Sequence, residues 1–156
     1  MNLHTITIRT TIITLVASFL MAFAYFFASA NYHDYDFSPL SVTMNGVLAG
    51  VAGLFCSAPL LVSWIVLRFL KHSFALILLL LSTIAYGLGM SYALYESWGN
   101  YGFLGGILFI AWPAGWFLCM IPVWNIALLL NWLLLKRASV QRLASEPKME
   151  GESFVG

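Results

Sequence analysis

Residues 105–135 read GGILFIAWPAGWFLCMIPVWNIALLLNWLLL, and this stretch decides the fold. It contains no charged residue and ends directly before a basic pair. A helix of roughly 20 apolar residues crosses a bilayer core about 30 Å thick. Two spans and a turn would need roughly 40 residues, more than the stretch offers. It therefore predicts one membrane-spanning helix over residues 112–135, with Trp112 and Trp132 at opposite interfaces.

Two prolines set the expected start and shape of this helix. A span that begins at Trp112 places Pro113 in the first turn, where a missing backbone N–H matters least. Pro122 lies inside the span, where it removes one backbone hydrogen bond and is expected to bend the helix. Lipid cannot satisfy the carbonyl that Pro122 frees, so we expect a neighbouring helix or a polar side chain to help.

The whole chain has the composition of a membrane protein. Hydrophobic residues make up 62% of it and charged residues 8%, whereas soluble domains carry about 25% charged residues. Three further apolar runs predict spans at about residues 11–30, 47–67 and 74–95. The sequence therefore predicts an all-α protein, a four-helix transmembrane bundle. Residues 1–135 would form this membrane domain, and residues 136–156 a polar, partly disordered tail.

The end of the first span resembles a cleavage site. Ala28-Ser29-Ala30 is a small-residue pattern like that preceding a signal-peptidase cut. The apolar run before it is long for a signal core and closer to a full span. We therefore expect an uncleaved helix, with cleavage as the open alternative. Both outcomes leave the later helices in the same orientation.

The basic residues predict the orientation. In a four-span topology every Lys and Arg falls on one side, and the loops around Asp34 and Glu96 have none. Basic flanks stay cytoplasmic, so we expect both termini inside. The expected location is the cell membrane, the inner membrane if the source is bacterial, with a multi-pass topology. The basic residues are Arg9, Arg68, Lys71, Lys136, Arg137, Arg142 and Lys148.

The predicted spans contain no Asp, Glu, Lys, Arg or His, which disfavours several functions. Intramembrane ionisable groups usually mark ion pathways and proton relays, so an ion-coupled carrier loses support. No histidine lies at membrane depth to ligate haem, and no HExxH zinc pattern occurs. Cys56 and Cys119 form no CxxC pair and no zinc pattern. We expect no enzymatic activity, no cofactor and no metal site. His33, Asp34, Asp36 and Glu96 share the outer side, but co-location alone predicts only an acidic surface.

Three glycines in the second span, Gly46, Gly50 and Gly53, form a stripe at helical spacing. Such a stripe lets another backbone come close, and we expect it to pack helices together. Whether the contact lies inside the chain or against a partner stays open.

Polar and aromatic side chains in the last span are the other candidates. Asn125 and Asn131 are expected to form polar interhelical contacts, although either could instead bind a headgroup or a small polar ligand. Trp112 and Trp116 lie four residues apart on one face. They form either an interfacial aromatic belt or a clamp for a flat hydrophobic ligand.

These features favour a non-enzymatic protein that acts by helix packing with a membrane partner. It would be a subunit, a regulator, or an immunity or exclusion protein. The alternative is an oligomeric carrier or channel for an apolar or neutral solute, because kinked helices can line cavities. The expected partners are the lipid bilayer and either a membrane protein or further copies of the chain. Nucleic acid is not expected.

Overall fold

The computed structural model contains four long helices and describes residues 2–33, 38–98 and 103–145. The helices are α1 (Leu3–His33), α2 (Pro39–Leu67), α3 (Ser73–Ser97) and α4 (Phe103–Ser145). No strand occurs within these three ranges. All four helices are long and apolar enough to cross a membrane. The prediction of an all-α chain with four such helices is therefore confirmed.

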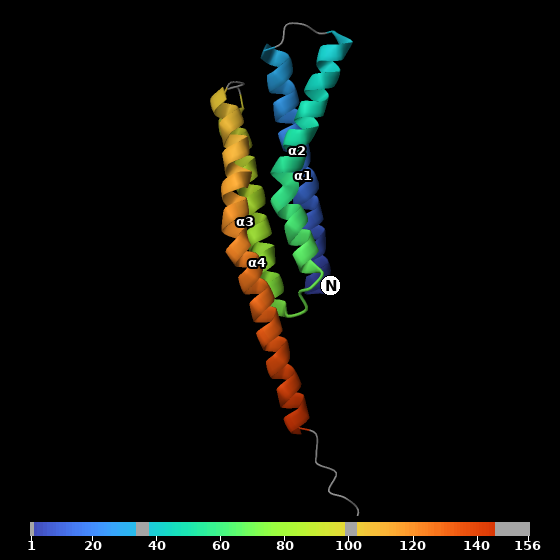
Figure 1. The fold of residues 1–156 in the computed structure, drawn as a ribbon, viewed down its shortest axis with the longest axis vertical. Helices are drawn as coiled ribbons and strands as arrows, with labels where there is room; N and C mark the ends of the chain where they lie inside the picture. The colour runs from blue at the N-terminus through green and yellow to red at the C-terminus, as the bar shows by residue number, and fades with distance from the viewer. Residues whose placement is uncertain (1, 34–37, 99–102, 146–156) are drawn as a thin grey trace, which may run out of the picture.

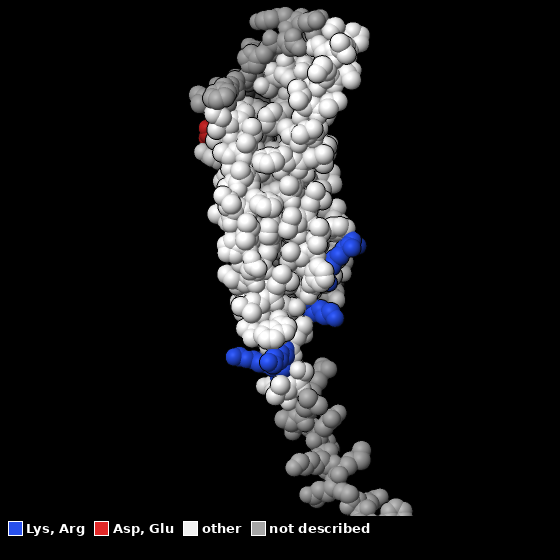
Figure 2. Space-filling view, in the orientation of Figure 1, with Lys and Arg blue, Asp and Glu red and all other residues white. Residues whose placement is uncertain are grey.

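The helices form two antiparallel hairpins that lie side by side (Figure 1). Helix α1 packs most extensively against α2 and also contacts α3, and α4 contacts α3 and α2. The N-terminus lies near the turn between α2 and α3, and the C-terminal part of α4 extends past that same end. On the face of the molecule drawn in Figure 2, the Lys and Arg side chains lie in the lower part, and an acidic side chain lies near the other end.

The helices are longer than the predicted spans. Helix α1 already begins at Leu3, and two threonine hydroxyls bond back to carbonyls of its first turns: Thr7 to Leu3, at 2.9 Å, and Thr14 to Thr10, at 2.8 Å. Such bonds use a polar side chain without interrupting the helix. The polar residues before the predicted span therefore continue the helix.

Helix α2 also starts earlier than predicted, because the sequence at its start is a good helix beginning. The Ser38 side chain accepts a hydrogen bond from the Ser41 backbone N–H at 3.3 Å, and Pro39 follows it in the first turn. Farther along α2, the Asn45 side chain donates a hydrogen bond to the Asn31 side chain of α1 at 3.2 Å, which joins the two helices. Asp34 and Asp36 of the predicted loop lie outside the described residues.

Helix α4 begins at Phe103, so Pro113 lies inside it. The prediction that Pro113 sits in the first turn is wrong. Residues 105–111 are apolar and carry no signal that ends a helix, so the helix runs through the proline. At its other end α4 includes residues 136–145 of the predicted tail. The rest of that tail lies outside the described residues.

Two apolar clusters fill the interior. One lies toward the turn between α2 and α3, where residues of α2, α3 and α4 meet. The other lies farther along the bundle and draws on all four helices. The largest fully buried apolar side chains of these clusters are Leu67, Leu70 and Leu79 in the first, and Tyr25, Leu60, Tyr86, Met90 and Phe109 in the second.

Candidate functional site

All four helices meet at a buried contact between Tyr25, Cys56, Tyr86 and Phe109. Each of these side chains is at most 1% exposed. The rings of Tyr25 and Phe109 stack at a centroid distance of 4.4 Å. The Tyr86 hydroxyl donates a hydrogen bond to the backbone carbonyl of Cys56. One residue from each helix is thus fixed in place, and we call this group the four-helix contact.

The Cys56 thiol bonds to a carbonyl that a proline leaves free. Proline has no N–H, so Pro113 cannot bond to the carbonyl four residues earlier, which belongs to Phe109. The Cys56 Sγ donates to that carbonyl oxygen at 3.2 Å. Both cysteines are free, and Cys119 is exposed whereas Cys56 is buried. The buried thiol thus supports the structure at the point where α4 lacks a backbone bond.

A double-mutant cycle tests whether the Cys56 thiol replaces the backbone N–H that Pro113 lacks. We expect Cys56→Ala to destabilise the bundle by about 1 to 2 kcal/mol, because it leaves the Phe109 carbonyl without a donor. In a Pro113→Ala background the loss is expected to be smaller, because the restored N–H of residue 113 satisfies that carbonyl. Unfolding free energies in detergent for the four variants measure the coupling. Equal losses in both backgrounds would contradict the assignment.

Trp112 and Trp116 pack between α3 and α4. Their rings stack at 5.6 Å, and Trp116 lies 5.8 Å from the Tyr86 ring. A Cβ added to Gly89 of α3 would lie 1.8 Å from Cζ2 of Trp112. The Trp112 indole therefore rests on bare backbone, and its buried Nε1 has no hydrogen-bond partner among the described residues. The pair belongs partly to the bundle interior, and Trp112 also lines an open groove described below.

The glycines of α2 differ in how closely another helix approaches them. A Cβ at Gly53 would lie 2.9 Å from the Phe19 ring and 3.2 Å from the Phe19 carbonyl oxygen. At Gly46 the nearest such atom is 3.9 Å away, and at Gly50 there is none within 4 Å. The close approach of α1 to α2 thus occurs at Gly53, at one end of the predicted stripe.

Helix α3 contributes close approaches outside that stripe. A Cβ at Gly87 would lie 2.8 Å from a methyl carbon of Thr14 in α1. Gly87 thus allows α1 to pack closely on one side of α3, and Gly89 allows α4 to pack closely on the other.

Asn131 joins α4 to the turn between α2 and α3. Its Oδ1 accepts hydrogen bonds from the backbone N–H groups of Lys71 and His72, both at 2.8 Å. Its Nδ2 donates to the Phe69 carbonyl at 3.1 Å. The side chain is 7% exposed. One buried amide thus holds three backbone groups of a turn that has no regular helix bonds at those positions.

Asn125 has a different environment, because it faces outward. Its Nδ2 donates to the Ile121 carbonyl of its own helix at 2.8 Å, and the residue is exposed. Its neighbours on that side of α4 are exposed and apolar, and we call the group the Asn125 face. This face consists of Leu118, Ile121, Pro122, Asn125, Leu129 and Trp132.

Helices α1 and α3 carry three buried hydroxyls, two on α1 and one on α3. The Oγ atoms of Thr11, Ser18 and Thr83 have no hydrogen-bond partner within residues 2–33, 38–98 and 103–145. All three residues are at most 1% exposed. They place polar atoms inside an otherwise apolar bundle.

Metal-ligating side chains do not gather in the described part of the chain: no group of three His, Cys, Asp or Glu residues occurs there. Comparison with protein families, with curated proteins and with solved structures gave no match. The functional argument therefore depends on the geometry of this chain.

Proposed function

We propose that this chain is a non-enzymatic membrane protein that binds the transmembrane part of another membrane protein. It would act as a subunit, a regulator, or an immunity or exclusion protein. The proposed contact is the Asn125 face of α4, and the proposed partner is a transmembrane helix that carries a hydrogen-bonding side chain at the same depth.

The exposure of Asn125 carries this proposal. In lipid a side-chain amide has no water to bond to, so it favours contact with a polar group of another helix. The bond from Nδ2 to Ile121 uses one of its two N–H groups. The second N–H and the Oδ1 can serve a partner. The surrounding apolar side chains would give that partner a surface to pack on.

The other polar side chains support the same proposal, because most of them form hydrogen bonds inside the chain. Asn131 binds the turn between α2 and α3, Ser63 accepts from the Trp124 indole at 3.0 Å, and Cys56 binds Phe109. Of the two asparagines in the predicted span of α4, Asn125 is the one that bonds only to its own helix. Membrane spans that carry no charge and whose polar groups mostly bond inside the bundle are typical of packing modules.

The proposed setting is a cell membrane with both termini in the cytoplasm. The basic residues at the start of α1, in the turn after α2 and near the end of α4 share one end of the bundle. Such an end stays cytoplasmic under the positive-inside rule.

The test is whether the chain binds a partner through Asn125. A tagged chain at its native expression level is extracted in mild detergent, and the complex is analysed by mass spectrometry. We expect a stoichiometric larger partner. Asn125→Leu should lower its recovery by roughly threefold to thirtyfold, which corresponds to an interhelical hydrogen bond of about 0.6 to 2 kcal/mol.

Thr43→Leu is the matched control. Thr43 is also exposed and also bonds to its own helix, to the Pro39 carbonyl at 2.7 Å, but it lies on α2. Its replacement should leave partner recovery unchanged. Equal losses in both variants, or no loss in Asn125→Leu, would contradict a docking role for the Asn125 face.

An oligomeric carrier or channel for an apolar or neutral solute is the second candidate. The three unpartnered hydroxyls of Thr11, Ser18 and Thr83 favour it, because buried hydroxyls can bind a passing polar solute. This candidate predicts that the extracted chain binds only copies of itself. It also predicts that proteoliposomes of the pure chain conduct the solute.

A further inference from the structure

Glu96 lies between two open grooves at the end of the bundle away from the basic residues. One groove, of about 500 Å³, runs between α3 and α4, and the other, of about 540 Å³, wraps the end of α3. Glu96 lines both. The first groove is otherwise lined by Tyr92, Ala93, Leu108, Ala111 and Trp112, and the second by Ser91, Leu94, Tyr95 and Trp98.

The electrostatics of this position favour a cation. Glu96 lies in the last turn of α3, where the helix dipole already places partial negative charge. It is the only carboxylate within the described ranges. The described Lys and Arg residues belong to the opposite end of the bundle (Figure 2). The sequences that link α1 to α2 and α3 to α4 contain no Lys and no Arg.

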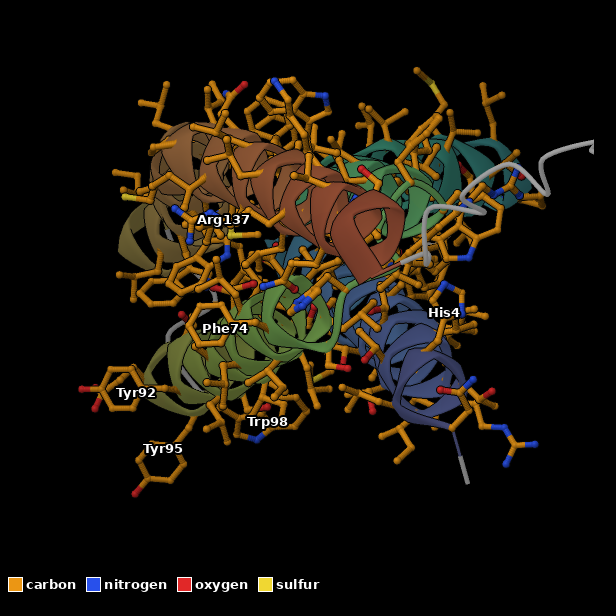
Figure 3. All side chains as sticks on the ribbon, turned by 90° about the horizontal axis from the view of Figure 1, so that it is seen from below. His4, Phe74, Tyr92, Tyr95, Trp98 and Arg137 are labelled. Carbon is orange, nitrogen blue, oxygen red and sulfur yellow. The ribbon has the colours of Figure 1, made fainter. Side chains whose placement is uncertain are left out.

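Three aromatic residues, Tyr92, Tyr95 and Trp98, line these two grooves together with the Glu96 carboxylate. Tyr92 lies four residues before Glu96 on α3 and lines the first groove with it. Tyr92, Tyr95 and Trp98 are 63%, 78% and 62% exposed. Figure 3 shows Tyr92 and Tyr95 pointing away from the bundle, with Trp98 on the same side of α3. Ring faces beside a carboxylate are the chemistry that binds ammonium groups, through cation–π attraction and direct charge pairing.

We propose that the two grooves bind a membrane lipid with an ammonium headgroup. The ammonium would lie at Glu96 among the rings of Tyr92, Tyr95 and Trp98. The acyl chain would follow the apolar part of the first groove, along Leu108, Ala111 and Trp112. The groove lies at the C-terminal end of α3, and a helix end is the depth at which headgroups meet a transmembrane helix. This site depends on the placement of the bundle in a bilayer and is independent of the Asn125 face.

Native mass spectrometry of the full chain tests the site. The purified chain in detergent is titrated with dioleoyl lipids that carry an ethanolamine, a choline or a glycerol headgroup. The two ammonium lipids should bind more tightly than the phosphatidylglycerol lipid. Glu96→Gln should weaken the binding of both by about fivefold and should not weaken binding of phosphatidylglycerol. Equal binding of all three lipids to the wild-type chain would overturn the proposal.

Two tryptophan variants separate the site from a general aromatic belt. Trp98 and Trp132 are similarly exposed, at 62% and 56%, but lie at opposite ends of the bundle. Trp98→Leu should weaken binding of the ethanolamine lipid, and Trp132→Leu should not. Equal effects would mean that the rings act only as interfacial anchors and would overturn the proposal. Because Glu96 is exposed, Glu96→Gln is not expected to change folding, and circular dichroism checks this.

Discussion

Replacing Gly89 by alanine is expected to destabilise the bundle by about 3 kcal/mol, although alanine normally stabilises a helix relative to glycine. The reason is the Trp112 indole. An added Cβ would lie 1.8 Å from Cζ2, 2.4 Å from Cε2 and 2.6 Å from Cη2 of that ring. Three ring atoms are involved, so the whole indole must move. That movement breaks its stack on Trp116. Equilibrium unfolding in mixed micelles measures the loss.

Gly115→Ala is the matched control, because nothing lies within 4 Å of a Cβ at that glycine. It should be neutral or stabilise the chain by up to about 1 kcal/mol, the ordinary effect of helix propensity. A second variant tests the mechanism. In a Trp112→Leu background, Gly89→Ala should cost much less, because the ring that meets the Cβ is gone. If Gly89→Ala is as mild as Gly115→Ala, the Trp112 ring does not rest on Gly89.

The number and type of the helices could be predicted from the sequence, because long uncharged runs decide both. The first and last residues of the helices were predicted less accurately. The predicted spans stop where strongly apolar residues stop, but a helix continues until something ends it. Thr7, which precedes the predicted first span, bonds to the Leu3 carbonyl of its own helix, and α4 runs through Pro113 without a break. The start of α2 did carry a signal, since Ser38 followed by Pro39 is a typical helix beginning.

The rotational setting of α4 could not be predicted from its own residues. The helix is apolar on all sides, so no periodic pattern marks an inner face. Asn125 and Asn131 therefore looked alike as candidates, yet one is exposed and the other is buried. What separates them is the turn at residues 69–72, which lies about 60 residues away in the chain.

The contacts between helices could not be predicted from the sequence either. Pro113 does identify the Phe109 carbonyl as free, because the two are four residues apart. Nothing in the sequence shows that the donor is Cys56 of another helix. The contact of Gly89 with Trp112 likewise depends on how α3 and α4 align along their length. Short polar and small residues in separate spans acquire partners only through that alignment.

Asn131→Leu is expected to destabilise the bundle by about 2 to 3 kcal/mol, because three backbone groups lose their partner together. The N–H groups of Lys71 and His72 and the carbonyl of Phe69 bond to this one amide. Leucine fills a similar volume, so the loss reports hydrogen bonds rather than a cavity. Asn125→Leu should change the stability by less than about 0.5 kcal/mol, since that amide bonds only to its own helix.

Hydrogen exchange gives a reading that global stability does not. The described bonds of the Lys71 and His72 amides go to Asn131, so their protection should depend on that side chain. Asn131→Leu should remove the protection. Asn131→Asp keeps an acceptor for both N–H groups but cannot donate to Phe69, so it should retain the protection at intermediate stability. Amides that stay protected in Asn131→Leu would mean that the turn between α2 and α3 is held by other groups. In that case α4 would not be oriented by Asn131, and the outward position of Asn125 would need another cause.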